Sequence, residues 1–294
     1  LRNMLVWTDR DGIIFDTLGR ASNYRDVRLS PDEKRIVFSR LDEDKVTEDI
    51  WVMDLQRKVT SRLTFEDKVE TCPTWSVDGK YVYYISDRDG KWKILRRQAS
   101  GIGGVEEVYT SSQSFAFPGP WLPDGKTMLI SQEVTGGTHI LALSTDDGTV
   151  VEEILTEPFN MYAVSLTRDG RYLAYYSNES GRDEVYVRDI GASGGKWQIS
   201  STGGDQPVWS ADESELYFWS ENSLLVVPVD FSDGSFSAGM PDTLFTRVRD
   251  QRGIWNQRYS VTRDGQRILM NARADEEGGS EFVVVLNWYE GIRK

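Results

Sequence analysis

Two residue types on which much enzyme and metal chemistry depends are almost absent from this chain. Among 294 residues there is one cysteine, Cys72, and one histidine, His139. An intrachain disulfide is therefore excluded, and a zinc site or a Ser-His-Asp triad would have to use that single histidine. No GxSxG sequence supplies a nucleophilic serine. Cys72 stands directly before Pro73, and we interpret it as a small buried residue and not as a nucleophile.

Long apolar runs and basic clusters are also lacking. No stretch of about eighteen apolar residues occurs, so we predict no membrane insertion by this chain. The net charge is −13, from 34 basic and 47 acidic residues spread along the sequence. A phosphate-binding surface needs clustered Lys and Arg, so we predict no nucleic-acid partner. The chain has no initiator methionine, and we expect it to be a fragment or ectodomain of a longer protein.

The chain does contain a twelve-residue unit in six copies. Each copy holds an aspartate, usually followed by glycine, between an apolar stretch and a run rich in Tyr, Ile, Val, Leu and Phe. This order predicts a strand, a tight turn and a second strand. The copies begin at Leu29, Trp75, Trp121, Leu166, Trp209 and Val261, and their turn aspartates are Asp32, Asp78, Asp124, Asp169, Asp212 and Asp264. A spacing of 43 to 52 residues with only strand patterns in between is typical of propeller blades.

Further strand patterns follow each hairpin. Third strands are expected at 49–55, 91–97, 138–144, 184–190, 224–230 and 281–287, and fourth strands at 61–64, 106–110, 153–156, 196–200 and 242–245. The last copy has no fourth strand of its own. Two apolar runs around an Asp-Gly turn in residues 4–19 are predicted to complete it, and either run could be the closing strand. We therefore predict an all-β fold, a six-bladed β-propeller of four-stranded antiparallel blades, as one domain over residues 1–294.

The first residue of each copy, three places before the turn aspartate, is always large and apolar. We assign this column to the packing between neighbouring blades. Asp-rich turns offer oxygen ligands that calcium would accept, but turn geometry explains the Asp-Gly pairs, and no EF-hand spacing occurs. The glycine-rich segment 191–196 lacks the spacing of a phosphate loop. We therefore predict no cofactor and no metal.

Irregular loops lead into the first strand of each blade and surround one end of the central channel. Because loops on a rigid scaffold commonly carry function, we expect binding there. The candidate binding residues are Arg25, Asp26, Glu70, Phe115, Phe117, Asn160, Tyr162, Asp205, Gln206, Arg252, Trp255, Asn256 and Arg258. Aromatic and arginine side chains dominate protein interfaces, which favours Trp255 and the two phenylalanines. The alternative is that these aromatic rings fold back onto their own blades.

The repeats resemble those of a known protein family. The repeats are similar to the WD40-like repeats of TolB-type six-bladed propellers over essentially the whole chain. Segments 5–12, 49–64, 175–210 and 283–294 further resemble the C-terminal propellers that bacteria attach, beyond a membrane-spanning helix, to serine/threonine protein kinase domains. The resemblance implies a non-catalytic sensor or scaffold outside the cytoplasmic membrane, and the kinase motifs themselves are absent from this sequence.

Two hypotheses on function follow. The favoured one is a monomeric binding module that recognises a protein, a peptide or a small ligand at the channel. The alternative is a hydrolase, or the accessory propeller of a peptidase, with an acid and metal site at the channel mouth. The residues six places before the turn aspartates are Asp26, Cys72, Pro118, Ala163, Gln206 and Arg258. This column contains a single carboxylate, whereas an acid and metal site would need several. The column therefore counts against the enzyme hypothesis, and we predict no catalytic residue.

Overall fold

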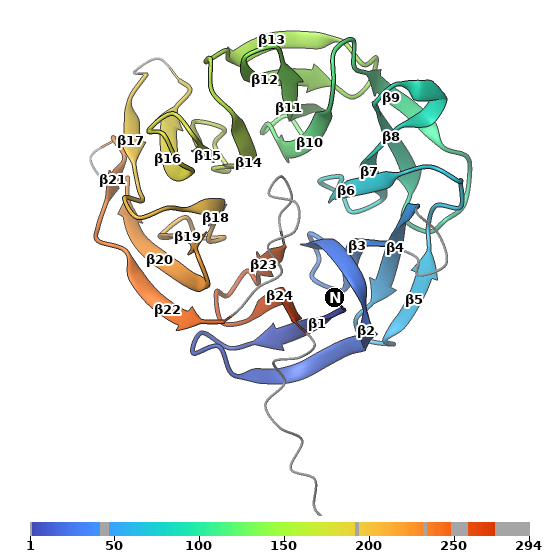
Figure 1. The fold of residues 1–294 in the computed structure, drawn as a ribbon, viewed down its shortest axis with the longest axis horizontal. Coiled ribbons are helices and arrows are strands. Elements are labelled where there is room, and N and C mark those ends of the chain that lie inside the picture. Colours follow the sequence, from blue (N-terminus) through green and yellow to red (C-terminus); the bar gives the residue numbers. More distant parts are fainter. Residues whose placement is uncertain (1, 42–46, 192–193, 232–233, 248–257, 274–294) are drawn as a thin grey trace, which may run out of the picture.

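Antiparallel sheets arranged around a central axis make up the fold (Figure 1). The structure, a computed structural model, describes residues 2–41, 47–191, 194–231, 234–247 and 258–273. These residues form strands and turns, with one 3-10 turn at Arg88–Gly90. The predicted all-β class and the predicted four-stranded antiparallel sheets are confirmed. No helix in the described part of the chain is long and apolar enough to cross a membrane.

Three sheets hold four strands each in chain order, and a fourth sheet has one additional short strand. The first comprises β6 (Glu70–Trp75), β7 (Tyr81–Ser86), β8 (Lys93–Gln98) and β9 (Glu106–Thr110); the second β10 (Ala116–Trp121), β11 (Thr127–Val134), β12 (Gly137–Ser144) and β13 (Val150–Leu155); the third β14 (Met161–Leu166), β15 (Tyr172–Ser177), β16 (Glu184–Asp189) and β17 (Lys196–Gln198). The fourth comprises β18 (Asp205–Trp209), β19 (Glu215–Ser220) and β20 (Ser223–Asp230), which pairs with both β21 (Ser237–Ala238) and β22 (Asp242–Thr246).

The remaining strands join the two ends of the chain in one seven-stranded sheet. Its order is β23 (Tyr259–Val261), β24 (Ile268–Arg273), β1 (Asn3–Thr8), β2 (Ile14–Leu29), β3 (Arg35–Leu41), β4 (Glu48–Asp54) and β5 (Val59–Arg62). The long strand β2 pairs with β1 through its first half and with β3 through its second half. The seven strands are therefore two four-stranded units that share β2.

Both N-terminal runs join the sheet that contains β24, and the first of them pairs with β24, which answers a question that the sequence left open. Strand β1 pairs with β24 along its whole length, from Asn3 opposite Arg273 to Thr8 opposite Ile268, and β2 lies beyond β1 (Figure 1). The third strand expected at 281–287 lies outside the described residues. Strand β1 occupies the place beside β24 that the expected strand was to take, so that assignment is corrected.

Hydrogen bonds inside the turn explain the aspartate of the repeat and the serine or threonine that stands two places before it in five of the six copies. In the β6–β7 hairpin the Ser76 hydroxyl donates to Asp78 (2.7 Å), and Asp78 accepts the backbone N–H of Lys80 (3.0 Å). The same hydroxyl accepts the N–H of Tyr81 (2.9 Å). These bonds hold the pKa of Asp78 at about 2, so the aspartate stays ionised and the turn stays fixed.

The large apolar residue three places before the turn aspartate packs as predicted. Trp75 and Trp209 are buried in hydrophobic clusters, and Leu29, Trp121, Leu166 and Val261 pack against such clusters. The indoles also link neighbouring sheets: Trp75 Nε1 donates to the Arg28 carbonyl (3.2 Å), and Trp121 Nε1 donates to the Trp75 carbonyl (2.8 Å). This column therefore fixes the spacing of adjacent innermost strands.

Two of the six turns have glutamate after the aspartate, and both glutamates contact the turn of a neighbouring four-stranded unit. Glu33 (φ 57°) and Glu213 (φ 61°) have the left-handed backbone that glycine adopts in the other four turns. The Glu213 carboxylate accepts the backbone N–H of Arg168, and the Glu33 carboxylate accepts that of Arg263. The arginine side chains donate in return to the carbonyls of Ala211 and Pro31. The Asp-Glu turns keep the backbone conformation of the Asp-Gly turns and add a clasp between sheets.

Removing one clasp tests this explanation. Glu213→Ala keeps a side chain in the left-handed region but loses the hydrogen bond, so we expect the free energy of unfolding to fall by about 1 kcal/mol. Glu213→Gly loses the same bond but relieves about 1 kcal/mol of backbone strain, so it should be less destabilising than alanine. Urea denaturation of both variants measures the difference. Equal stability of the alanine variant and the parent protein would contradict the clasp.

Candidate functional site

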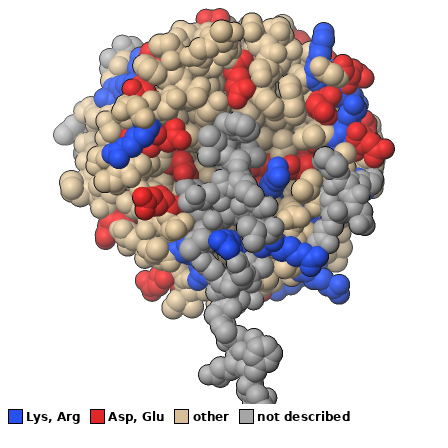
Figure 2. Space-filling model, viewed as in Figure 1, with Lys and Arg blue, Asp and Glu red and all other residues tan. Residues whose placement is uncertain are grey.

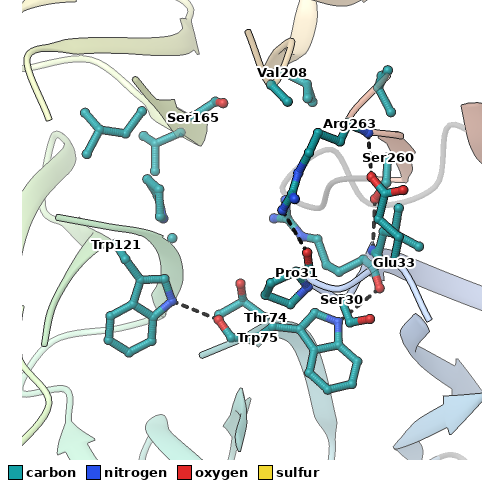
Figure 3. Close-up of a pocket in the computed structure, with 18 residues that line it drawn as sticks. Ser30, Pro31, Glu33, Thr74, Trp75, Trp121, Ser165, Val208, Ser260 and Arg263 are labelled. Carbon is teal, nitrogen blue, oxygen red and sulfur yellow. Dashed lines mark hydrogen bonds between the residues drawn. The ribbon is translucent and has the colours of Figure 1, made fainter. Parts of the chain in front are cut away.

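Two cavities lie along the central axis and share three lining residues, Arg28, Gly119 and Val164. The larger has a volume of about 360 Å³ and is lined by the last residues of the innermost strands and by the turns that follow them (Figure 3). We call this the turn end of the channel. The smaller cavity, about 20 Å³, has room for one water molecule and is lined by residues from the middle of the same strands. The opposite opening, where the loops enter the innermost strands, is called the loop end.

The repeat column four places before the turn aspartate faces the larger cavity. Unlike the apolar residues beside it, this column is mostly polar or small, and its members all line the cavity: Arg28, Thr74, Pro120, Ser165, Val208 and Ser260. None of them was among the residues predicted to bind. The sequence did carry a usable pattern, since a polar position that recurs inside an apolar strand indicates a side chain facing a water-filled channel.

A bulge recurs in the innermost strands where they approach the smaller cavity. Asp26, Cys72, Ala163 and Gln206 have positive φ angles of 31°, 54°, 47° and 54°, and the strand register shifts at each of them. These are members of the column six places before the turn aspartates. A bulge turns the backbone locally, so a peptide N–H can point across the strand. The N–H of Cys72 donates to Asp26 Oδ2 (3.0 Å) in this way.

Asp26 forms a buried carboxyl pair with Glu48. The hydroxyls of Ser39 and Thr71 each contact both Asp26 Oδ2 and Glu48 Oε1, at 2.5 to 3.0 Å. Burial raises the pKa of both carboxyl groups, and the charge of Asp26 raises that of Glu48 further. The two hydroxyls therefore bridge the two carboxyl groups.

Arginines surround this carboxyl pair. Arg25 Nη1 lies 3.0 Å from Glu48 Oε2, and its side chain is 39% exposed at the loop end. Arg258 is buried, and its charge partly offsets the rise in the pKa of Asp26. Burial lowers the pKa of Arg28 to about 10, which leaves its guanidinium charged at neutral pH.

Burial also raises the pKa of the Cys72 thiol well above its ordinary value, so this thiol is unreactive.

Three of the predicted aromatic residues, Phe115, Phe117 and Tyr162, lie in or against the hydrophobic core. Phe115 packs on Trp92 (ring centroids 4.2 Å apart) and on Phe117 (5.6 Å), and Phe117 contacts Tyr162 (6.0 Å). Phe117 and Tyr162 are 7% and 6% exposed. The alternative stated for these aromatics is that they fold back onto their own blades; Phe115 and Phe117 instead pack against rings of the neighbouring sheets.

The other predicted residues are distributed around the loop end. Gln206 accepts a hydrogen bond from the backbone N–H of Arg258 (2.9 Å), so these two predicted residues are in contact. Asn160 is exposed, and Asp205 begins β18. Arg252, Trp255 and Asn256 lie outside the described residues. The structure also brings in Ser39, Glu48 and Thr71, which sequence reasoning missed because their contacts form only when β2, β4 and β6 pack together.

Glu70, also predicted, lies apart from the carboxyl pair, at the beginning of β6. Its side chain is fully buried, and burial raises its pKa to about 7. Within the described residues, no group of three or more His, Cys, Asp or Glu side chains has an arrangement that could hold a metal ion.

The raised pKa of Glu70 predicts a measurable pH dependence. A buried carboxyl stabilises the fold while it is protonated, so this contribution is complete below about pH 4.5 and is lost as the pH rises through about 7. We expect Glu70→Gln to remove about 3 kcal/mol of pH-dependent destabilisation between pH 4 and 9. Urea denaturation across that range, with the exposed Glu152→Gln as control, measures the difference in slope. Parallel curves for Glu70→Gln and the parent protein would rule out the assigned pKa.

Comparison with known proteins agrees with this geometry. A family model for the TolB beta propeller domain matches residues 25–190, more than half of the chain. An uncharacterized peptidase of Bacillus subtilis is 26% identical over 165 residues, which are 55% of this chain and 24% of that protein. An uncharacterized protein of Agrobacterium fabrum is 32% identical over 110 residues, 37% of this chain and 36% of that protein. The chain thus spans about a quarter to a third of these curated relatives.

Solved structures show the same fold. A structure from Agrobacterium tumefaciens assigned to TolB superposes with a TM-score of 0.73 at 16% identity and covers 92% of this chain and 98% of that one. TolB from Acinetobacter baumannii gives a TM-score of 0.63 at 17% identity over 92% of this chain and 63% of that one. Together with the repeat turns and the sheets around one axis, the family match leads to one conclusion: the chain belongs to the TolB beta propeller domain family.

Proposed function

We propose that this chain is a non-catalytic binding module that recognises a protein or peptide partner at the loop end of its channel. The observation that supports this proposal concerns Arg25. Its guanidinium is exposed at the loop end and held by the buried Glu48, so the cation is presented in a fixed position. A fixed arginine on a rigid scaffold suits an acidic group on a partner and loses little side-chain entropy on binding.

The state of the two carboxyl groups supports a binding role. Asp26 and Glu48 are occupied with the hydroxyls of Ser39 and Thr71, with the N–H of Cys72 and with Arg25. The contacts with Thr71 and Cys72 join neighbouring sheets, and those with Ser39 and Arg25 join strands of one sheet. We therefore assign the pair to holding the channel wall, because carboxyl groups engaged in this way are poorly placed to activate water or to bind a metal.

We infer further that the sheets number six and close into a ring through the pairing of β1 with β24. This pairing supports closure because it covers the edge that β24 would otherwise expose and ties residues 3–8 to residues 268–273. Closure also gives the loop end a rigid circular rim. On that rim acidic and basic side chains are interspersed over the visible face, without an extended area of one sign (Figure 2).

The biological setting is also a proposal. The sequence resemblance to propellers of bacterial transmembrane serine/threonine kinases supports a sensor outside the cytoplasmic membrane, and the TolB family match supports a protein partner. The alternative role is the accessory propeller of a peptidase. The Bacillus subtilis relative favours it, because that protein is described as a peptidase and this chain matches only 24% of its length. In either role the propeller recognises a polypeptide partner, and another domain processes that partner or signals its presence.

Site-specific photo-crosslinking in cells tests the binding role. We expect a photoreactive residue in place of the exposed Asn160, at the loop end, to give discrete protein adducts. The same group at the exposed Val151, on the outer strand β13, serves as control. Arg25→Glu should reduce the Asn160 adducts at least fivefold because it reverses the presented charge. Adducts at Val151 alone, or equal yields in the Arg25→Glu protein, would exclude the loop end as the recognition surface.

A further inference from the structure

The larger cavity at the turn end contains hydrogen-bond donors that have no acceptor in the described part of the chain. Arg28 makes no side-chain hydrogen bond or ion pair there. The Thr74 hydroxyl is likewise unengaged. The hydroxyl oxygens of Ser165 and Ser260 accept backbone N–H groups, from Trp209 (3.4 Å) and Leu29 (3.2 Å), so each keeps its own proton available. Donor groups from four innermost strands thus line one space, and Figure 3 shows Thr74, Ser165 and Ser260 on different sides of it.

Most acceptors and other charges near this cavity are already occupied, and the exception among the described residues is Asp26 Oδ1, a buried oxygen without a hydrogen-bond partner that lines the smaller cavity. Glu33 accepts the backbone N–H of Arg263, and the Arg263 side chain donates to the Pro31 carbonyl (3.1 Å). Asp26, the acid nearest to Arg28 along the strand, is bonded to Ser39, Thr71 and the N–H of Cys72. The free donors of the cavity therefore outnumber its free acceptors among the described residues, and an anionic, acceptor-rich ligand would satisfy them.

Apolar surface forms most of the remaining wall. The indole N–H groups of Trp75 and Trp121 are bonded to backbone carbonyls, so these rings offer only their apolar surfaces to a ligand. Leu29, Pro120 and Leu166 add aliphatic surface. The volume of about 360 Å³ lies in the range of small-molecule sites. Pro31 and Arg263, which line the cavity, are exposed, so the cavity reaches the surface between the turns.

We propose that the turn end of the channel is a binding site for a monoanionic carboxylate with an apolar body, held by Arg28 and the hydroxyls of Thr74, Ser165 and Ser260. A guanidinium donates two parallel N–H bonds to one carboxylate, and the indole and aliphatic walls enclose the apolar part of the ligand. The protein's net charge of −13, and a single cavity arginine, Arg28, that has no hydrogen-bond acceptor among the described residues, favour a monoanion over a polyanion such as phosphate. The carboxylate can belong to a free small acid or to the C-terminus of a peptide.

Calorimetric titration with matched acid and amide probes tests the site. We expect 4-phenylbutyrate to bind saturably, and its neutral analogue 4-phenylbutyramide to bind at least tenfold more weakly. Acetyl-leucyl-leucine and its amide form the second pair, and a preference for the dipeptide acid identifies a peptide C-terminus as the source. Trp75 and Trp121 line the cavity, so tryptophan fluorescence should report occupancy. Equal binding of acid and amide, displacement by equimolar inorganic phosphate, or no saturable binding of either acid would overturn the proposal.

Variants separate the site from general effects on folding. Arg28→Met should weaken binding of 4-phenylbutyrate at least tenfold, Arg28→Lys should recover part of it, and Ser260→Ala should weaken it two- to fivefold. Arg57→Met, at an exposed arginine in the β4–β5 turn, is the control and should bind like the parent protein. If Arg28→Met does not fold, Ser260→Ala combined with Thr74→Val decides the question: unchanged binding would refute the site. Loop-end crosslinking is measured separately, so failure of either proposal is recognised independently.

Discussion

The convergence of the innermost strands on one axis is the constraint on which the rest of this structure depends. Strands that meet around an axis leave little room, and their side chains must alternate between the wall of the channel and the packing between sheets. Trp75 and Trp121 meet this requirement by filling the space between sheets while their indole N–H groups bond the backbone of the preceding strand. The same bonds set how far apart the strands stand, and so the width of the channel at the turn end.

Crowding at the axis also explains why strain and buried charge occur together. The left-handed bulges at Asp26 and Cys72 bring a backbone N–H within 3.0 Å of a carboxyl that is otherwise short of donors. Burial raises the pKa of Asp26 and Glu48. The positive charges of the arginines around them offset the repulsion between the two carboxyl groups. A strained backbone and two buried carboxyl groups are costs that a rigid, closely packed wall can maintain.

The two ends of the channel differ because different parts of the repeat form them. The turn end is built from the regular Asp-Gly or Asp-Glu turns and from a repeat column, so its lining follows the repeat alignment. The loop end is built from segments of unequal length and composition, where Arg25 emerges beside Glu48. Regularity favours a defined cavity around Arg28, whereas irregularity favours a surface shaped to one partner.

The sequence by itself determined the strand order, the hairpins and the packing column, because these depend on short-range turn chemistry and on alternation along a strand. The sequence also contained the polar column four places before each turn aspartate, which includes Arg28 and Ser260. The sequence-based prediction considered the column six places before each aspartate instead. Only the tertiary structure decided that β1 lies beside β24, that Asp26 pairs with Glu48, and that Glu213 accepts from Arg168. The physical reason is that these contacts join residues far apart in the chain, whose spacing is fixed only when the sheets assemble around the axis.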